Sequence, residues 1–142
     1  MKGISLWEPW ASAIAWDLKR IETRGWLTPY RGPLAICAAR TTLHAGFIHD
    51  PSVRRYFESV GITRVDRLPF GHIVAVARLN QIYPVEHLTN ISEQERAFGN
   101  YDAGRFGWDL ADLRRLKTPI PFRGMQGLFR IPFGTLDGAL FE

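Results

Sequence analysis

The sequence predicts an α+β fold, a small mixed β-barrel with peripheral helices. Short segments with the composition of β-strands outnumber the helical segments, and the helical segments lie between the strands instead of following them as a group. The chain has 142 residues, 46% of them hydrophobic, with no long linker, low-complexity tract or internal repeat. We therefore expect residues 1–142 to form a single domain with its own core.

The first part of the chain is expected to contain three strands and one helix. Residues 2–6 (KGISL) form a short strand, and a helix begins at Pro9, whose fixed φ suits a helix start. Asp17 ends this helix, because aspartate adopts the left-handed conformation more readily than most residues. A strand within WDLKRIETRGW follows, and the apolar run 33–39 (PLAICAA) is typical of a strand buried on both faces.

The middle of the chain combines an interrupted helix with a long strand. Residues 42–60 have helical patterning that breaks before Pro51, since the residue preceding a proline is displaced from the α region. The segment 71–85 (GHIVAVARLNQIYPV) has the clearest strand pattern, with β-branched residues in alternation between a glycine and a proline.

The last third of the chain starts with a short helix. Ser92 and Glu95 have the spacing of a capping box, and Gly99 is expected to end the helix. Residues 105–110 indicate a strand, followed by either a second strand or a helical turn, and GMQGLFRIP contains a last short strand.

The strand expected in WDLKRIETRGW has an unusual combination of side chains. Because side chains alternate between the faces of a strand, Arg20, Glu22, Arg24 and Trp26 share one face, and the intervening isoleucine and threonine take the other. A solvated face does not explain the indole, and a buried face does not explain the charges. We therefore predict that this face lines a polar pocket, within reach of Lys19 in the preceding turn.

Two interpretations of these residues remain open. An exposed Glu22–Arg24 pair would contribute little to stability, whereas in a pocket Arg24 would fix a carboxylate that accepts hydrogen bonds from a base. Trp26 and Tyr30 each lie beside an arginine near the end of a strand, where stacking on an unpaired base is feasible. The repeated Pro-aromatic-Arg-Gly segments 29–32 and 121–124 are either tight turns or a pair of guanidinium groups for phosphate.

The charge balance favours an anionic partner such as nucleic acid. The formal net charge is +4, and only Lys2, Lys19 and Lys117 are lysines among the 18 basic residues. Arginine binds phosphate bidentately and stacks on bases, although a GC-rich coding sequence would produce the same bias.

Several classes of protein are not expected. Cys37 is the single cysteine, which indicates a reducing cytoplasm and no internal disulfide. Glu8 and Pro9 interrupt the only stretch that resembles a signal peptide, and no segment approaches the roughly 18 apolar residues of a membrane span. The histidines are too scattered for a metal site, and we expect no cofactor; they are His44, His49, His72 and His87.

Much of the chain resembles the ASCH domain family (activating signal cointegrator homology). The resemblance rests on the segment 4–40, which begins ISLWEPW, and on the later blocks GHIVAVARL, YPV, AGRFGWDL and PIPFRGMQGLF. The family motif is Gly-x-Lys-x-x-Glu-x-Arg, and Lys19, Glu22 and Arg24 match its three functional positions. Asp17 stands at the glycine position, which a turn tolerates.

The resemblance implies a PUA-like β-barrel with a cleft lined by the motif, and a role in binding RNA or a modified nucleobase. In that role Glu22 and Arg24 would read the base, and Lys19 would meet polar or phosphate groups. Backbone contacts would come from three arginines, namely Arg31, Arg40 and Arg123.

The resemblance also implies two alternative functions. Some small relatives are amidohydrolases that act on N4-acetylcytidine through a lysine, a threonine and a glutamate, and others are metal-dependent ribonucleases. Here Lys19 matches, but Glu22 stands at the threonine position and GHIVAVARL has no carboxylate, so Lys19 and Glu22 would have to share proton transfer. The remaining alternative is a protein-interaction adaptor in transcription.

Overall fold

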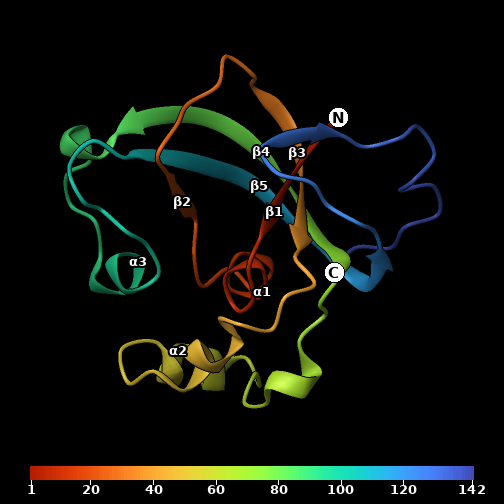
Figure 1. The fold of residues 1–142 in the computed structure, drawn as a ribbon, viewed down its shortest axis with the longest axis horizontal. Coiled ribbons are helices and arrows are strands. Elements are labelled where there is room, and N and C mark those ends of the chain that lie inside the picture. The colour runs from red at the N-terminus through yellow and green to blue at the C-terminus, as the bar shows by residue number, and fades with distance from the viewer.

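The computed structural model describes residues 1–142 as one six-stranded sheet with three α-helices, which lie below the sheet in Figure 1. The strands are β1 (Lys2–Leu6), β2 (Ile21–Arg24), β3 (Gly32–Ala38), β4 (His72–Pro84), β5 (Phe106–Pro121) and β6 (Leu128–Arg130). The helices are α1 (Trp10–Ala15), α2 (Arg54–Ser59) and α3 (Glu93–Ala97), with short 3₁₀ helices at Ala45–His49, Val65–Arg67 and Val85–His87. The predicted α+β class is confirmed.

The sheet is mixed and curled into a half-barrel. Its strand order is β2-β5-β4-β3-β1-β6, in which β1 and β3 run parallel and every other neighbouring pair is antiparallel. The long strands β4 and β5 arch across the molecule, and β2 pairs with the first residues of β5 (Figure 1). This arrangement is that of a PUA-like barrel, and it makes the motif-bearing β2 an edge strand.

Strand β5 corrects one prediction. It runs without a break from Phe106 to Pro121, whereas a second strand or helical turn was expected after residue 110. Asp112 has a φ of 51°, and the register with β4 shifts at three places along the pair. Such bulges bend a strand instead of ending it, so the local irregularity in the sequence becomes the curvature of the sheet.

The ends of the helices follow the sequence signals with one exception. Asp17 is left-handed, with a φ of 60°, and Asp50 before Pro51 is extended, as expected. At α3 the Ser92 hydroxyl accepts a hydrogen bond from the Glu95 N–H, which is half of the predicted capping box. Gly99 is not the left-handed cap: a Cβ there would lie 2.8 Å from the ring of Tyr101, so its role is close packing.

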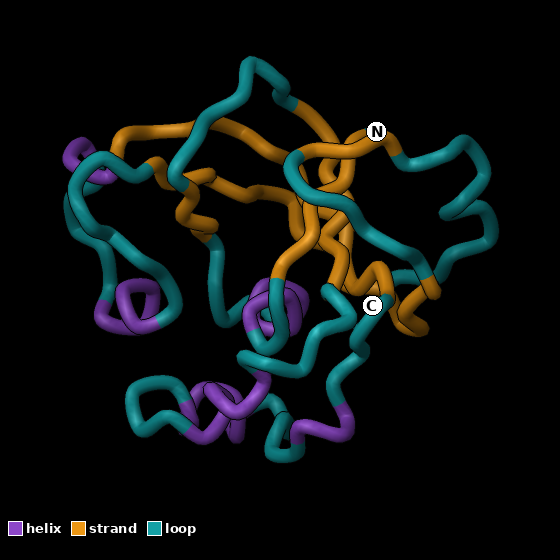
Figure 2. Tube along the Cα trace, in the orientation of Figure 1, coloured by secondary structure: helices purple, strands orange, loops and turns teal.

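The interior divides into three groups of buried side chains. The largest lies between α1 and the sheet and includes Ile14, Leu34 and the fully buried Trp108. A second group surrounds Phe57 in the lower layer, where α2 and its flanking turns gather in Figure 2. Cys37 belongs to the third group, and burial raises the pKa of its thiol to about 12, as befits an inert core residue.

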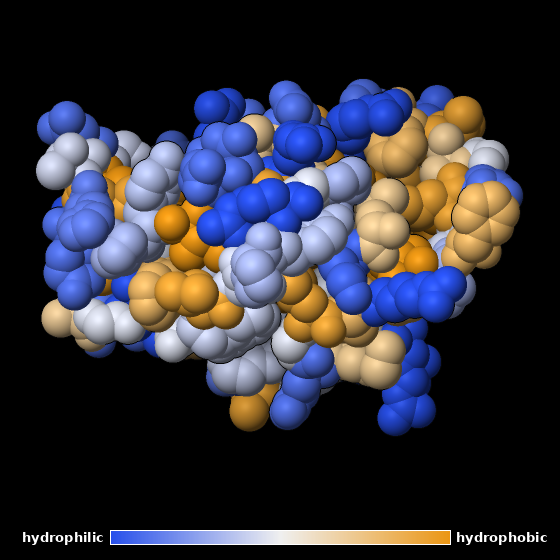
Figure 3. All heavy atoms as spheres, turned by 90° about the horizontal axis from the view of Figure 1, so that it is seen from above, coloured by the Kyte–Doolittle hydropathy of each residue, from blue (hydrophilic) through white to orange (hydrophobic).

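One face of the surface is mostly polar with dispersed apolar groups (Figure 3). On the face shown in Figure 3, hydrophobic side chains form several separate groups between hydrophilic ones. None of the helices has the length and apolar character that crossing a membrane requires.

Candidate functional site

A large cleft opens beside β2. Its volume is about 1150 Å³, and its walls come from β2 with the residues that follow it, the end of β1, and the segments 97–100 and 124–127. Glu22, Arg24 and Trp26 all line it. Three of the four residues predicted to share a face therefore lie along one wall of a concave site. The fourth, Arg20, precedes β2 and lines a different pocket, and Thr23, expected on the opposite face, also contributes to the cleft.

Glu22 is held by a cation at each of its oxygens. Its Oε1 lies 3.4 Å from Lys19 Nζ, and its Oε2 lies 3.2 Å from Arg24 Nη2, while the side chain is 12% exposed. Burying a carboxylate is costly unless opposite charges and hydrogen bonds compensate for the lost hydration. The two cations supply that compensation and fix the carboxylate in one orientation.

Lys19 lies behind Glu22 and is 2% exposed. Its ammonium group donates hydrogen bonds to the carbonyl oxygens of Ile21 and Phe98, both at 2.7 Å. Its third partner is the Glu22 carboxylate, at ion-pair distance. This differs from the expectation that Lys19 meets a ligand directly; its position suits it to hold the carboxylate.

Arg24 is only partly engaged by the protein. Its Nη2 donates to the Ser5 carbonyl oxygen at 3.0 Å and pairs with Glu22. Its Nε is buried without a partner, and no hydrogen bond within the protein uses its Nη1. Because the side chain is 25% exposed, this guanidinium still has donors to offer in the cleft.

The segment between β4 and β5 is attached to the start of β2 by polar contacts. The Glu95 carboxylate accepts hydrogen bonds from the backbone N–H groups of Arg20 and Ile21, at 3.0 and 2.8 Å. Gln94 donates from its side chain to the Leu18 carbonyl oxygen at 2.9 Å. Glu95 therefore leaves its capping box half made and instead positions Arg20 and Ile21, the two residues between Lys19 and Glu22 of the motif.

The same segment also holds the middle of β2. The Thr23 hydroxyl accepts from the Asn100 N–H at 3.0 Å, and Arg105 donates to the Thr23 carbonyl oxygen at 3.1 Å. The bond from Arg105 occupies a backbone carbonyl oxygen that β2 would otherwise leave free as the last strand of the sheet. Hydrogen bonds with Glu95, Asn100 and Arg105 therefore fix the position of β2 in the cleft wall.

Aromatic side chains form part of the lining. Trp26 packs edge-on against the buried Trp108, with ring centroids 4.9 Å apart, and Trp108 donates its indole N–H to the Trp26 carbonyl oxygen. Trp7 also lines the cleft, stacked on His44 at 3.9 Å between centroids. Both indoles are partly exposed, which leaves ring surface for a flat ligand.

Five residues proposed from the sequence lie outside the cleft lining, and one of them, Lys19, lies behind Glu22 and lines a second pocket instead. The Tyr30 ring packs against the main core, and its hydroxyl donates to the Pro33 carbonyl oxygen. Arg31 donates to the carbonyl oxygens of Thr28 and Tyr30, so it closes its own turn. The other two, Arg40 and Arg123, are exposed and each follows or precedes a lining residue in the chain.

Sequence reasoning missed other residues of the cleft. Trp7, Asn100 and Arg105 line it, and none was proposed as a site residue. Trp7 carried a usable signal, because it follows a strand directly and precedes a Glu-Pro turn, a place where an indole is hard to bury. Asn100 and Arg105 carried none, since only the tertiary fold brings them to Thr23.

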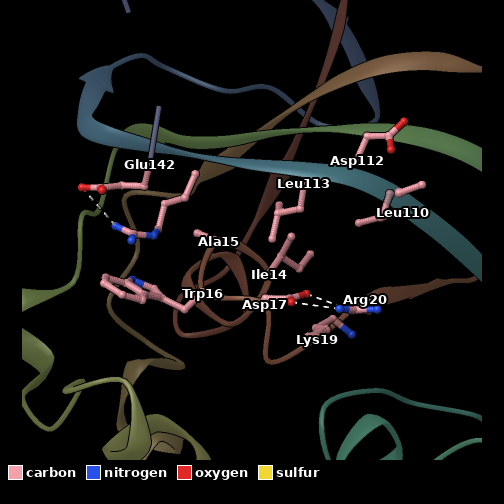
Figure 4. Close-up of a pocket in the computed structure, with 12 residues that line it drawn as sticks. Ile14, Ala15, Trp16, Asp17, Lys19, Arg20, Leu110, Asp112, Leu113 and Glu142 are labelled. Carbon is pink, nitrogen blue, oxygen red and sulfur yellow. Dashed lines mark hydrogen bonds and ion pairs between the residues drawn. The ribbon is translucent and has the colours of Figure 1, made fainter. Parts of the chain in front are cut away.

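A second, smaller pocket of about 520 Å³ lies between the end of α1 and β5 (Figure 4). Its charges are mostly paired with one another: Arg20 binds the Asp17 carboxylate at 2.9 Å through two nitrogens. Arg115 lies 3.6 Å from the Trp16 ring centroid and 4.0 Å from Glu142. Nowhere in the chain do three or more histidine, cysteine, aspartate or glutamate side chains gather as metal ligands would.

The family model of the ASCH domain matches residues 4–120. The chain belongs to the ASCH domain family. Membership of this family indicates nucleic acid as the general class of partner. No curated protein matches the chain.

Solved ASCH structures share the fold. An ASCH protein from Zymomonas mobilis is 18% identical, with a TM-score of 0.56, over 96% of this chain and 90% of that one. Two mutants of the Zymomonas mobilis protein give TM-scores of 0.55, at 18% and 17% identity, and cover 96% of this chain and 93% and 91% of theirs. At these identities the similarity supports the ASCH fold alone.

Proposed function

We propose that this ASCH domain binds single-stranded RNA by taking one base, unmodified or modified, into the cleft beside β2. The observation that carries the proposal is the Glu22 carboxylate, held at both oxygens by cations on the wall of a cleft with exposed indoles. An unstacked base presents N–H donors on its edge and an aromatic face, and proteins read both features in single strands. The Glu22 carboxylate would accept from the edge, and Trp26 would stack on the face.

The charges in the cleft favour a base over a phosphate group. Glu22 and Asp50 are balanced there by Arg24 and Arg105, so the lining has no excess of positive charge. The net charge of +4 lies mainly elsewhere, and Arg40 and Arg123 stand beside lining residues on the outer surface. We assign backbone phosphate contacts to these two arginines and to Arg31.

The structure lowers the rank of the hydrolase alternative. Proton transfer by Lys19 and Glu22 requires Lys19 to reach the substrate, yet Lys19 is buried and its ammonium group is bound to two carbonyl oxygens and paired with Glu22. The Thr23 hydroxyl is likewise held by the Asn100 N–H. Turnover of N4-acetylcytidine, or of RNA with or without a divalent metal, by the purified protein would reverse this order.

Measuring RNA affinity against salt concentration tests the proposal. Affinity for a short single-stranded RNA is expected to fall as salt rises. The logarithm of the association constant should decrease linearly with the logarithm of the salt concentration, with a slope of about −0.7 for each phosphate contacted. Trp26→Ala should weaken binding by about 1–3 kcal/mol, the usual contribution of one stacked base. Trp16→Ala is the matched control, because Trp16 is similarly exposed, at 39% against 36%, but lies in the other pocket.

The proposal fails if no RNA binds, or if both tryptophan variants weaken binding equally. A comparison of thermal unfolding for the two variants shows whether lost packing between Trp26 and Trp108 contributes to the result. Salt-independent binding of a protein partner instead would favour the adaptor alternative.

A further inference from the structure

The cleft offers hydrogen-bond acceptors and donors side by side at one place. Glu22 is an acceptor only, and each of its oxygens meets one cation within the protein, which leaves a lone-pair direction on each oxygen for a ligand. Arg24 is a donor only, and its Nη1 makes no hydrogen bond within the protein. A ligand that fits both groups must present two donors next to an acceptor.

The other charged groups of the cleft offer no comparable pair. Asp50 accepts two hydrogen bonds from Ser52 at one oxygen and has no guanidinium beside it among its contacts. Arg105 is bound to the carbonyl oxygens of Thr23 and Asn100. The Glu22–Arg24 pair is therefore where a base edge would be read.

The four RNA bases differ in how well they match this pair. The Watson–Crick edge of guanine carries the O6 acceptor, then the N1–H donor, then the N2 amine donor, in one row. Adenine, cytosine and uracil each carry a single donor group on that edge, so each can use only one Glu22 oxygen fully. Guanine alone places a donor at both carboxylate oxygens and an acceptor at the guanidinium.

We infer that the cleft selects guanine, an inference that rests on the proposed RNA-binding function. The N1–H and N2 amine of the base donate to the Glu22 carboxylate, and Arg24 Nη1 donates to O6. Lys19 makes the selection strict, because it holds the carboxylate from behind and prevents it from turning to suit a different edge. Trp26 stacks on the ring and contributes affinity without preference among bases.

Pentanucleotides of uridine with a varied central base test the inference on the unmodified protein. Guanosine and inosine at the centre share O6 and N1–H and differ only in the 2-amino group. The guanosine oligonucleotide should bind at least about tenfold more tightly than the inosine one, as expected for one lost hydrogen bond to a charged acceptor. Oligonucleotides with adenosine, cytidine or uridine at the centre should also bind more weakly than the guanosine oligonucleotide.

A variant pair assigns the effect to Glu22. Glu22→Gln replaces one acceptor oxygen by a donor, so the ratio of guanosine to inosine affinity should fall towards one. Glu8→Gln should leave that ratio unchanged, because Glu8 is buried beneath α1 and does not line the cleft.

The outcomes separate the inference from the function on which it rests. Tight, salt-dependent binding of every oligonucleotide with equal affinities for guanosine and inosine would overturn guanine selection and leave RNA binding intact. Absence of binding to all of them would overturn both. A guanosine preference that persists in Glu22→Gln would move the reading site away from this pair.

Discussion

Glu22, in β2, and Glu8, in the turn between β1 and α1, are both carboxylates with little solvent exposure, yet their partners differ. Glu22 has a cation at each oxygen and keeps 12% of its side chain exposed in a cleft. Glu8 is fully buried, and its only partners are the N–H and the hydroxyl of Ser12, at 2.8 and 2.7 Å. Burial raises the pKa of Glu8, because no positive charge offsets the lost hydration.

The difference separates a structural carboxylate from a site carboxylate. The Glu8 carboxylate accepts a hydrogen bond from the Ser12 N–H, one of the free backbone donors in the first turn of α1. It is fully buried, so no ligand can reach it. Glu22 is held by two cations within the protein and is accessible from the cleft. A recognition group that is fixed in this way is preorganised for its ligand. A shifted pKa alone would have selected Glu8, so burial without access does not identify a functional site.

The largest effect that we predict comes from removing the cation behind Glu22. Lys19→Met should lower the free energy of unfolding by about 3–5 kcal/mol, because it leaves Glu22 with Arg24 as its only cation and removes the donor from the carbonyl oxygens of Ile21 and Phe98. Urea denaturation measures the loss. Lys117→Met, on an exposed lysine, is the control and should change stability little; equal losses in the two variants would contradict the role given to Lys19.

The next effect distinguishes the two carboxylates by RNA affinity. Glu22→Gln should weaken binding of single-stranded RNA by about 1.5–3 kcal/mol, the usual cost of losing a hydrogen bond to a charged group. Glu8→Gln should bind as the wild type does. A fluorescence titration at constant salt measures both, and a similar loss in both variants would show that fold stability, and not base reading, is responsible.

A smaller effect is expected at the attachment of α3 to β2. Glu95→Gln should cost about 1–2 kcal/mol of stability, because a neutral amide accepts less strongly from the N–H groups of Arg20 and Ile21. Glu93→Gln on the same helix is the control, since the Glu93 side chain is exposed and makes only a 3.9 Å contact with Arg55. Equal hydrogen-exchange protection of β2 in both variants would argue against the attachment.

A further effect appears in the pH dependence of stability. The pKa of Glu8 is raised in the folded state, so the folded chain binds the proton more tightly than the unfolded chain does. Wild-type stability should therefore fall as pH rises from the ordinary carboxyl pKa of 4.5 through the raised value. Glu8→Gln keeps both bonds to Ser12 without a charge. The difference in free energy of unfolding between this variant and the wild type should therefore grow in favour of the variant across that interval, as measured by denaturation at pH 4 to 8. A constant difference would contradict the assignment.

The sequence predicted much of the sheet and one wall of the cleft. Alternation in a strand depends only on local backbone geometry, so it correctly grouped Glu22, Arg24 and Trp26 on one face. The same local reasoning did not foresee the internal contacts of Tyr30 and Arg31, whose turn folds back on itself through bonds to the Pro33 and Thr28 carbonyl oxygens. A turn signal identifies a change of direction but not the surface that the turn faces.

What the sequence determined by itself is the order of strands and helices and the charged pattern on β2, since periodicity and turn chemistry act over a few residues. Tertiary structure alone decided that Lys19 is buried, because its acceptor on Phe98 lies 79 residues away along the chain. The same holds for Asn100 and Arg105, which lie in the last part of the β4–β5 connection and reach Thr23 only in the folded chain. Hydrogen bonds between distant segments form only once the core brings those segments together, so no local pattern encodes them.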